Sequence, residues 1–178
     1  DTYSFIDQML NEKRISDLFS FTYIGNIPKN FIFENTKVIP PLSGESLATE
    51  LKKYDGYITG SINEPSGNHH IEAALCGLPI LYLESGGIPE YANDYGLSFS
   101  NPKSLEVKIF EFISKYDQNY QNLKDFPYVS TRMCEDYLDS FNEILKNKEI
   151  YFKNRNKPSF SLFQFELFKY NLIKFIFK

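Results

Sequence analysis

Two acidic residues and two glycine-containing turns have the types and spacing that suggest chemistry in this sequence. Glu64 and Glu72 have seven residues between them, and the small-residue turn Pro65-Ser66-Gly67 lies in that interval. The second turn is Ser85-Gly86-Gly87, which Pro89-Glu90 follows closely. A carboxylate accepts two hydrogen bonds in a forked geometry, which suits neighbouring hydroxyl groups of a sugar. We therefore expect the stretch 61–91 to hold the binding site.

The elements predicted around this stretch bring it to one edge of a sheet. Tyr57–Gly60 is predicted to be a buried strand, and the chain then leaves the sheet through residues 61–67. Ligands of open α/β sheets bind outside the carboxyl ends of the strands. A helix over His69–Cys76 should follow, with free N–H groups at its start that favour an anion such as a diphosphate. Glu72 is expected in about the first turn of that helix.

The ends of this helix have their own signals. Ser66 or Asn68 is predicted to cap its start, and Gly77 is predicted to end it in a left-handed conformation before Pro79. At the other turn, Gly86 and Gly87 lack a Cβ, so the backbone there can approach a phosphate or a sugar and offer N–H groups.

Ordinary structural explanations exist for the same residues. Glu64 is alternatively a solvated loop acid, and Glu72 an acid that interacts with the helix dipole. His69 and His70 either touch a donor sugar or are polar residues at a helix start. A third metal ligand is not found at a suitable spacing, so no metal site is expected.

The whole ordered set over residues 54–99 resembles the donor-binding motif of family 4-like retaining glycosyltransferases with the GT-B fold. In that family the pattern is E-x7-E around a small-residue loop, E-A-x-x-C/A-G-x-P, a hydrophobic strand, G-G and P-E. The matching residues here are Glu64, Ser66-Gly67, Glu72-Ala73, Cys76-Gly77, Pro79, Gly86-Gly87 and Pro89-Glu90. The resemblance covers roughly residues 1–115.

The resemblance implies the donor-binding C-terminal half of an enzyme that transfers a sugar with retention. Its fold would be a Rossmann-like parallel sheet flanked by helices, one half of a GT-B fold. Glu64 would be the catalytic residue beside the donor sugar, and Glu72 would hold the ribose hydroxyls. The other substrate-binding residues implied are Ser66, Gly67, Asn68, Gly86, Gly87 and Gly25. The donor is a nucleoside diphosphate sugar, and no further cofactor or metal is implied.

One part of the family pattern is not found. Family members carry an Arg and a Lys in a loop after the first strand, whereas Phe19–Asn26 resembles the second strand, with Gly25 at its tip. The Arg/Lys loop therefore either lies upstream of Asp1 or is missing, and Lys29 is a candidate substitute. The N-terminal acceptor-binding half is also expected outside this chain. Alone, the chain should bind donor weakly and catalyse nothing.

Two other functions stay open. One is a nucleotide-sugar epimerase of the same fold, and the other is a non-catalytic binding or membrane-docking subunit. A dinucleotide-dependent dehydrogenase is disfavoured because no G-x-G-x-x-G motif follows a predicted strand. The acceptor implied by the resemblance is a glycan or a lipid-linked molecule, as in polysaccharide or lipopolysaccharide synthesis.

Composition bounds the remaining possibilities. The chain has 178 residues and a net charge of −4, which argues against a nucleic-acid partner. Cys76 and Cys134 form no disulfide-framework pattern, and no signal peptide is recognised. The expected location is therefore the cytoplasm, either free or at the inner face of the membrane.

The charge is uneven along the chain, which suggests two parts. Residues 1–145 hold 11 Lys and Arg against 21 Asp and Glu, whereas residues 146–178 hold 8 against 2. We expect a nucleotide-sugar-binding domain over 1–146 and a basic, aromatic tail over 147–178 that begins with the polar link Lys146–Pro158. The tail either packs on the missing half or lies on a membrane surface.

The other predicted elements complete an alternating pattern that indicates one parallel sheet. Further strands are expected at Phe19–Ile24, Thr36–Ile39, Ile80–Leu83 and, as a short edge strand, Leu97–Phe99. Helices are expected over 4–18, from Ser43 or Glu45 to Tyr54, over 102–118 and over 130–146.

Overall fold

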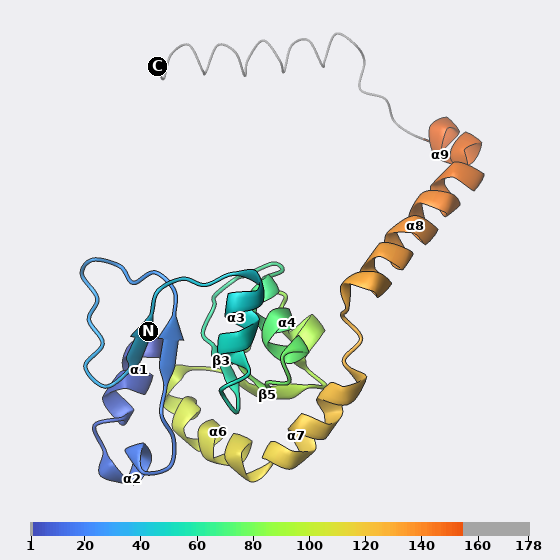
Figure 1. Cartoon of the computed structure of the whole chain (residues 1–178). Helices are drawn as coiled ribbons and strands as arrows, with labels where there is room; N and C mark the ends of the chain where they lie inside the picture. The colour runs from blue at the N-terminus through green and yellow to red at the C-terminus, as the bar shows by residue number, and fades with distance from the viewer. Residues whose placement is uncertain (1, 155–178) are drawn as a thin grey trace, which may run out of the picture. The chain divides into compact units, whose positions relative to one another are not determined.

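The structure, a computed structural model, describes residues 2–154 (Figure 1). The chain forms two compact units, Asp1–Val129 and Ser130–Lys178. From the sequence, the boundary is predicted between residues 146 and 147. The helix over 130–146 is grouped instead with the second unit.

The first unit alternates short strands with helices, which confirms the expected α/β class with parallel strands. In chain order its elements are α1 (Thr2–Met9), α2 (Lys13–Ser16), β1 (Thr22–Ile24), β2 (Lys37–Ile39), α3 (Gly44–Leu51), β3 (Tyr57–Thr59), α4 (Asn68–Leu75), β4 (Ile80–Leu83), α5 (Ile88–Ala92), β5 (Gly96–Phe99), α6 (Pro102–Ser114), α7 (Tyr116–Asn122) and a 3-10 turn, Leu123–Asp125.

The strands pair in two parallel ladders, so the prediction of one continuous sheet is wrong. In the first ladder β1 pairs with β2, and Tyr23 lies opposite Val38. The second ladder has the order β3-β4-β5, and its central strand places Leu81 between Ile58 and Leu97. The edge position expected for the last strand is confirmed. The two ladders are separate because β1 and β3 do not pair.

Helices cover both faces of the strands (Figure 1). On one face, Ile6 of α1 and Ile109 of α6 pack with Leu81 and Phe99 in a buried core. On the other face, Ala73 of α4 packs with residues of α3, and Ala74 of the same helix packs on β4 and α5. β4, the central strand of the second ladder, is thus buried on both faces, as its continuous apolar run Ile80–Leu83 indicates.

The helix expected over 4–18 is broken. The chain turns after α1, where Asn11 N–H donates to Gln8 C=O and Glu12 N–H donates to Met9 C=O. This turn lets Ile15 of α2 return to the core, where only 1% of its surface is exposed. Asp7 is a buried acid that accepts hydrogen bonds from the N–H groups of residues 34 and 35.

The other helix boundaries differ by a few residues. α3 begins after Ser43, as expected, but ends at Leu51 instead of Tyr54. α6 begins with Pro102 and has a capping box between Asn101 and Ser104, and it ends at Ser114 where the sequence predicts a helix to residue 118. Gly77 follows α4 with a φ of +88°, the left-handed conformation predicted for it.

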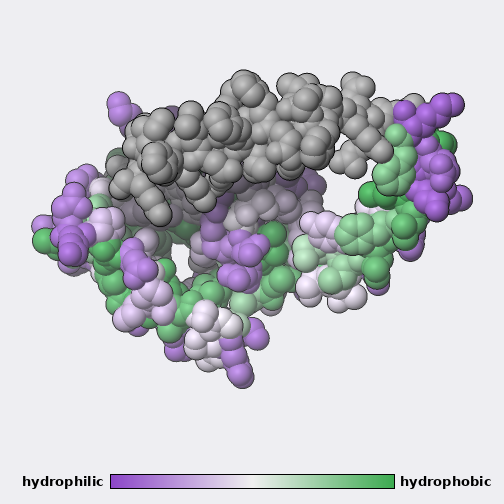
Figure 2. All heavy atoms as spheres, turned by 90° about the horizontal axis from the view of Figure 1, so that it is seen from above, coloured by the Kyte–Doolittle hydropathy of each residue, from purple (hydrophilic) through white to green (hydrophobic). Residues whose placement is uncertain are grey.

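The second unit contains two helices in its described part. α8 covers Ser130–Lys146, as predicted, and α9 covers Lys148–Asn154, within the stretch predicted to be a polar link. α8 has no buried residue, and Figure 2 shows hydrophobic side chains on the surface of this unit. Within residues 2–154 the helices are too short or too polar to cross a bilayer. Residues 155–178, the larger part of the predicted basic, aromatic tail, lie outside the described residues.

Candidate functional site

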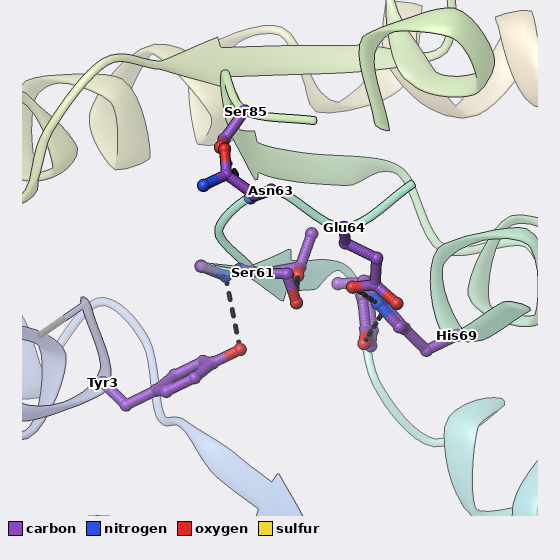
Figure 3. A network of polar contacts seen from close by, with 9 residues as sticks. Tyr3, Ser61, Asn63, Glu64, His69 and Ser85 are labelled. Atoms are coloured by element: carbon purple, nitrogen blue, oxygen red, sulfur yellow. Dashed lines mark hydrogen bonds and ion pairs between the residues drawn. The ribbon is translucent and has the colours of Figure 1, made fainter. Parts of the chain in front are cut away.

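A line of hydrogen bonds joins the Glu64 loop to the start of α4 and to β3 (Figure 3). Glu64 Oε2 lies 2.8 Å from His69 Nε2, and His69 Nδ1 lies 2.9 Å from the Tyr57 hydroxyl. An ionised carboxylate only accepts hydrogen bonds. His69 therefore donates its Nε2–H to Glu64, and its Nδ1 accepts the O–H of Tyr57 when the ring is neutral.

The pKa shifts agree with this assignment of protons. The hydrogen bond from His69 lowers the pKa of Glu64 below its ordinary value of 4.5, so Glu64 is ionised at neutral pH. Burial raises the pKa of the Tyr57 hydroxyl, and the negative charges of Glu64 and Glu72 raise it further. Tyr57 thus keeps its proton at neutral pH.

Gly67 makes the Glu64–His69 pair possible. It is the N-cap residue of α4, and a Cβ there would overlap the Glu64 carboxylate and lie 2.7 Å from His69 Nε2. The prediction that Ser66 or Asn68 caps this helix is wrong, because no side chain caps it. Ser66 Oγ instead lies 3.3 Å from the hydroxyl of Tyr91.

The Gly86-Gly87 turn interlocks with the loop that carries Glu64. Asn63 N–H donates to Ser85 Oγ at 2.9 Å (Figure 3). Gly87 N–H donates to Glu64 C=O at 2.8 Å. Gly86 has a φ of +63°, and a Cβ there would lie 2.6 Å from Glu64 N. The close backbone approach foreseen for these glycines is therefore an approach to the protein's own chain.

A cavity of about 980 Å³ opens next to this network, between β1 and β3. At the carboxyl ends of these strands its lining includes Gly25, Ser61, His69 and Glu72. The predicted residues thus fall into two groups. Gly25 and Glu72 line the cavity, whereas Glu64, Ser66, Gly67, Gly86 and Gly87 form the adjoining loops. His69 belongs to both, since it lines the cavity and bonds to Glu64.

Glu72 and Asn68 occupy different parts of α4. Asn68 is the first residue of the helix and is exposed. Glu72 is also exposed but lies beyond the first turn, so the expectation of a first-turn acid is wrong. Among residues 2–154, no side chain forms an ion pair with Glu72. Its carboxylate is available at the cavity wall.

Sequence reasoning missed the parts played by Tyr57 and His69. The available signal was a histidine five residues after a glutamate, with a glycine turn between them.

His70 is fully buried against the ring of Tyr91, and neither ring nitrogen has a protein partner. Burial lowers the pKa of His70 and keeps it neutral. Within the described part of the chain, no cluster of three or more His, Cys, Asp or Glu residues could hold a metal.

Parallel strands with helices on both faces, and polar residues at the carboxyl ends of the strands, define a Rossmann-like α/β domain. Among solved structures, the chain is similar to the pneumococcal O-GlcNAc transferase GtfA, determined in complex with UDP and GlcNAc. The two are 15% identical, and the similarity covers 80% of this chain and 27% of that chain, with a TM-score of 0.48. The chain thus spans about a quarter of that protein's length. No protein-family model and no curated protein matches the sequence.

Proposed function

We propose that this chain is the donor-binding half of a retaining glycosyltransferase with the GT-B fold. The observation that carries the proposal is the Glu64–His69–Tyr57 line, which ends at a cavity wall where Glu72 is exposed. His69, the partner of Glu64, and Glu72 both line the cavity at the carboxyl ends of the strands, where open α/β sheets bind ligands. The ordered sequence motif around Glu64 and Glu72 supports the same function.

The two carboxylates have different parts in this proposal. Glu72 is exposed and accepts hydrogen bonds from the ribose hydroxyls of a nucleoside diphosphate sugar. Glu64 is held by His69 beside the donor sugar. The diphosphate lies against the N–H groups at the start of α4, which favour negative charge.

The reaction is the departure of a nucleoside diphosphate from the anomeric carbon of the donor. Positive charge develops on the sugar ring in such a transition state, and a fixed carboxylate stabilises it. Because Glu64 already has a lowered pKa and a fixed partner, its charge is in place before the donor binds. The acceptor, a glycan or a lipid-linked molecule, binds to the acceptor-binding half of the GT-B fold, which is not part of these 178 residues.

Calorimetry with a panel of nucleoside diphosphate sugars tests the roles of the two carboxylates in donor binding. Glu72→Ala should weaken binding of the preferred donor about tenfold or more, since hydrogen bonds to a charged group contribute about 1.5–3 kcal/mol. Glu64→Ala should bind the donor nearly as well, and should lose turnover when the chain is paired with its acceptor-binding half.

The control is Asp94→Ala, which removes an exposed acid that lines no part of the cavity. It should bind like the unmodified chain. Donor binding that is the same in Glu72→Ala as in the unmodified chain would contradict the proposal.

A further inference from the structure

The cavity next to the site extends along the full length of two strands that do not pair. β1 and β3 belong to different ladders, and the cavity of about 980 Å³ between them is lined from both sides. Phe19 and Gly56 line it where the strands begin, Tyr23 and Ile58 along their length, and Gly25 and Ser61 where they end. We refer to this space as the strand slot.

The two strands run in the same direction on either side of the slot. Thr22, at the start of β1, and Tyr54, which lies just before β3, both line the slot, and Ile24 of β1 packs with Tyr54 on one buried cluster. At the other end, the ring of Tyr3 lies 5.6 Å from that of Tyr23, and the Tyr3 hydroxyl accepts a hydrogen bond from Gly60 N–H. The starts of both strands are therefore close, and so are their ends.

Backbone hydrogen-bonding groups of both strands point into the slot. Tyr57 N–H donates to Pro79 C=O, so Tyr57 faces β4 and the next residue, Ile58, faces away from it. Gly25 N–H donates to Ile39 C=O, so Gly25 faces β2 and Ile24 faces the slot. A strand between them would find donors and acceptors on both sides.

The faces of the two ladders continue each other across the slot. Phe21, before β1, and Ile58 of β3 pack on the same buried cluster. Ile24 of β1 and Tyr57 of β3 pack on the opposite cluster, which includes Leu51. A strand in the slot would have apolar layers above and below it, which is the environment of a continuously apolar parallel strand.

We infer that the strand slot accepts one apolar β-strand, parallel to β1 and β3, delivered by polypeptide joined to the start of α1. Thr2 lies at the end of the slot, since a Cβ on Gly60 would be 2.5 Å from Thr2 Oγ1. A parallel strand finishes at this end and connects directly to α1. An antiparallel strand would finish at the opposite end, about 10 Å away for a strand of three residues. The inserted strand joins the two ladders into one sheet, and this inference does not depend on donor binding.

The experiment fuses a strand of about five alternating Val and Ile residues, followed by a short Gly-Ser connection, to Asp1 of the whole chain. Amide hydrogen exchange should slow about tenfold or more at Ile24 and Ile58, whose N–H groups face the slot. Exchange at Tyr57, which is already bonded to β4, should change much less. A control fusion carries Pro at alternate strand positions, which removes ladder donors.

Three results would overturn the inference. They are unchanged exchange at Ile24 and Ile58, equal protection by the Pro control, and a doubled mass by size-exclusion chromatography. The last result would show that the strand inserts into a second copy and is not delivered within one chain.

Discussion

The two parts of the candidate site differ in how firmly the fold holds them. The loops around Glu64 are interlocked through backbone contacts, with Gly87 N–H bonded to Glu64 C=O and Asn63 N–H bonded to Ser85 Oγ. The cavity wall at Gly25 and Glu72 is open, and the Glu72 carboxylate is exposed. His69 connects the two parts, because it bonds to Glu64 and also lines the cavity.

This difference suggests a division of work. A group that stabilises charge in a transition state acts best when its position is fixed in advance. A group that recognises a ligand needs an accessible surface. The interlocked loops meet the first requirement, and the open wall meets the second. The substitutions below test whether the two parts are as different as their contacts indicate.

The largest effect is expected from Gly86→Ala. The new Cβ would sit in a left-handed conformation and press on the Glu64 backbone, so the free energy of unfolding should fall by about 3 kcal/mol. Gly44→Ala is the matched control, since Gly44 has a similar φ of +56° with nothing within 4 Å. Gly44→Ala should lower the free energy of unfolding by only about 1 kcal/mol. Equal losses in urea denaturation would show that the loops are not interlocked.

A smaller effect is expected along the Tyr57–His69–Glu64 line. Tyr57→Phe removes one hydrogen bond to His69, so it should lower the free energy of unfolding by about 1 kcal/mol. Glu64→Gln acts on the other nitrogen of the same ring. The double variant should depart from additivity by about 0.5 kcal/mol or more. Strict additivity in the double-mutant cycle would mean that His69 does not couple the two groups.

The Glu64–His69 pair should also make stability depend on pH. Folding lowers the pKa of Glu64 below 4.5. As the pH falls, the Glu64 carboxylate therefore takes up a proton at a higher pH in the unfolded chain than in the folded chain. The pair therefore stabilises the fold above pH 4.5, and this contribution disappears as the pH falls through the lowered pKa. The stability difference between the unmodified chain and Glu64→Gln should shrink in acid. A difference that stays constant below pH 4.5 would contradict the assigned partner.

The smallest effect on stability is expected at the open wall. Glu72 is exposed, so Glu72→Ala should change the free energy of unfolding by less than about 0.5 kcal/mol. Thermal unfolding of the variant without ligand measures this directly. A loss as large as that of Gly86→Ala would place Glu72 in the framework of the site and not at its surface.

Individual strands and turns around the site could be predicted from the sequence better than the pairing and the contacts between them. Ile80–Leu83 and Gly77 match the structure because an apolar run and a glycine before proline are local signals. Local sequence does not decide whether β1 and β3 pair, so alternation of strands and helices predicted one sheet where two ladders exist. The Glu64–His69 contact depends on the path of the chain through Gly67, which residue spacing does not encode.

Helical periodicity was also an incomplete guide. It extended the first helix across Asn11, where the chain turns so that Ile15 reaches the core. It also placed an apolar stripe on α8 correctly, but in the described part of the second unit this stripe is exposed. Phe141 and Leu145, for example, are 56% and 67% exposed. A periodic pattern identifies a helix and its apolar face, but it does not identify what the face packs against.

The central claim is that the interlocked loops and the open wall bind one sugar nucleotide together. The most direct test is an NMR titration of the whole chain with a panel of nucleoside diphosphate sugars. One donor should shift the amide signals of Gly67, Asn68 and Gly25 in a saturable way, and Glu72→Ala should weaken that response. If no donor shifts these signals, or if the shifts lie only at the amino ends of the strands, the claim is wrong.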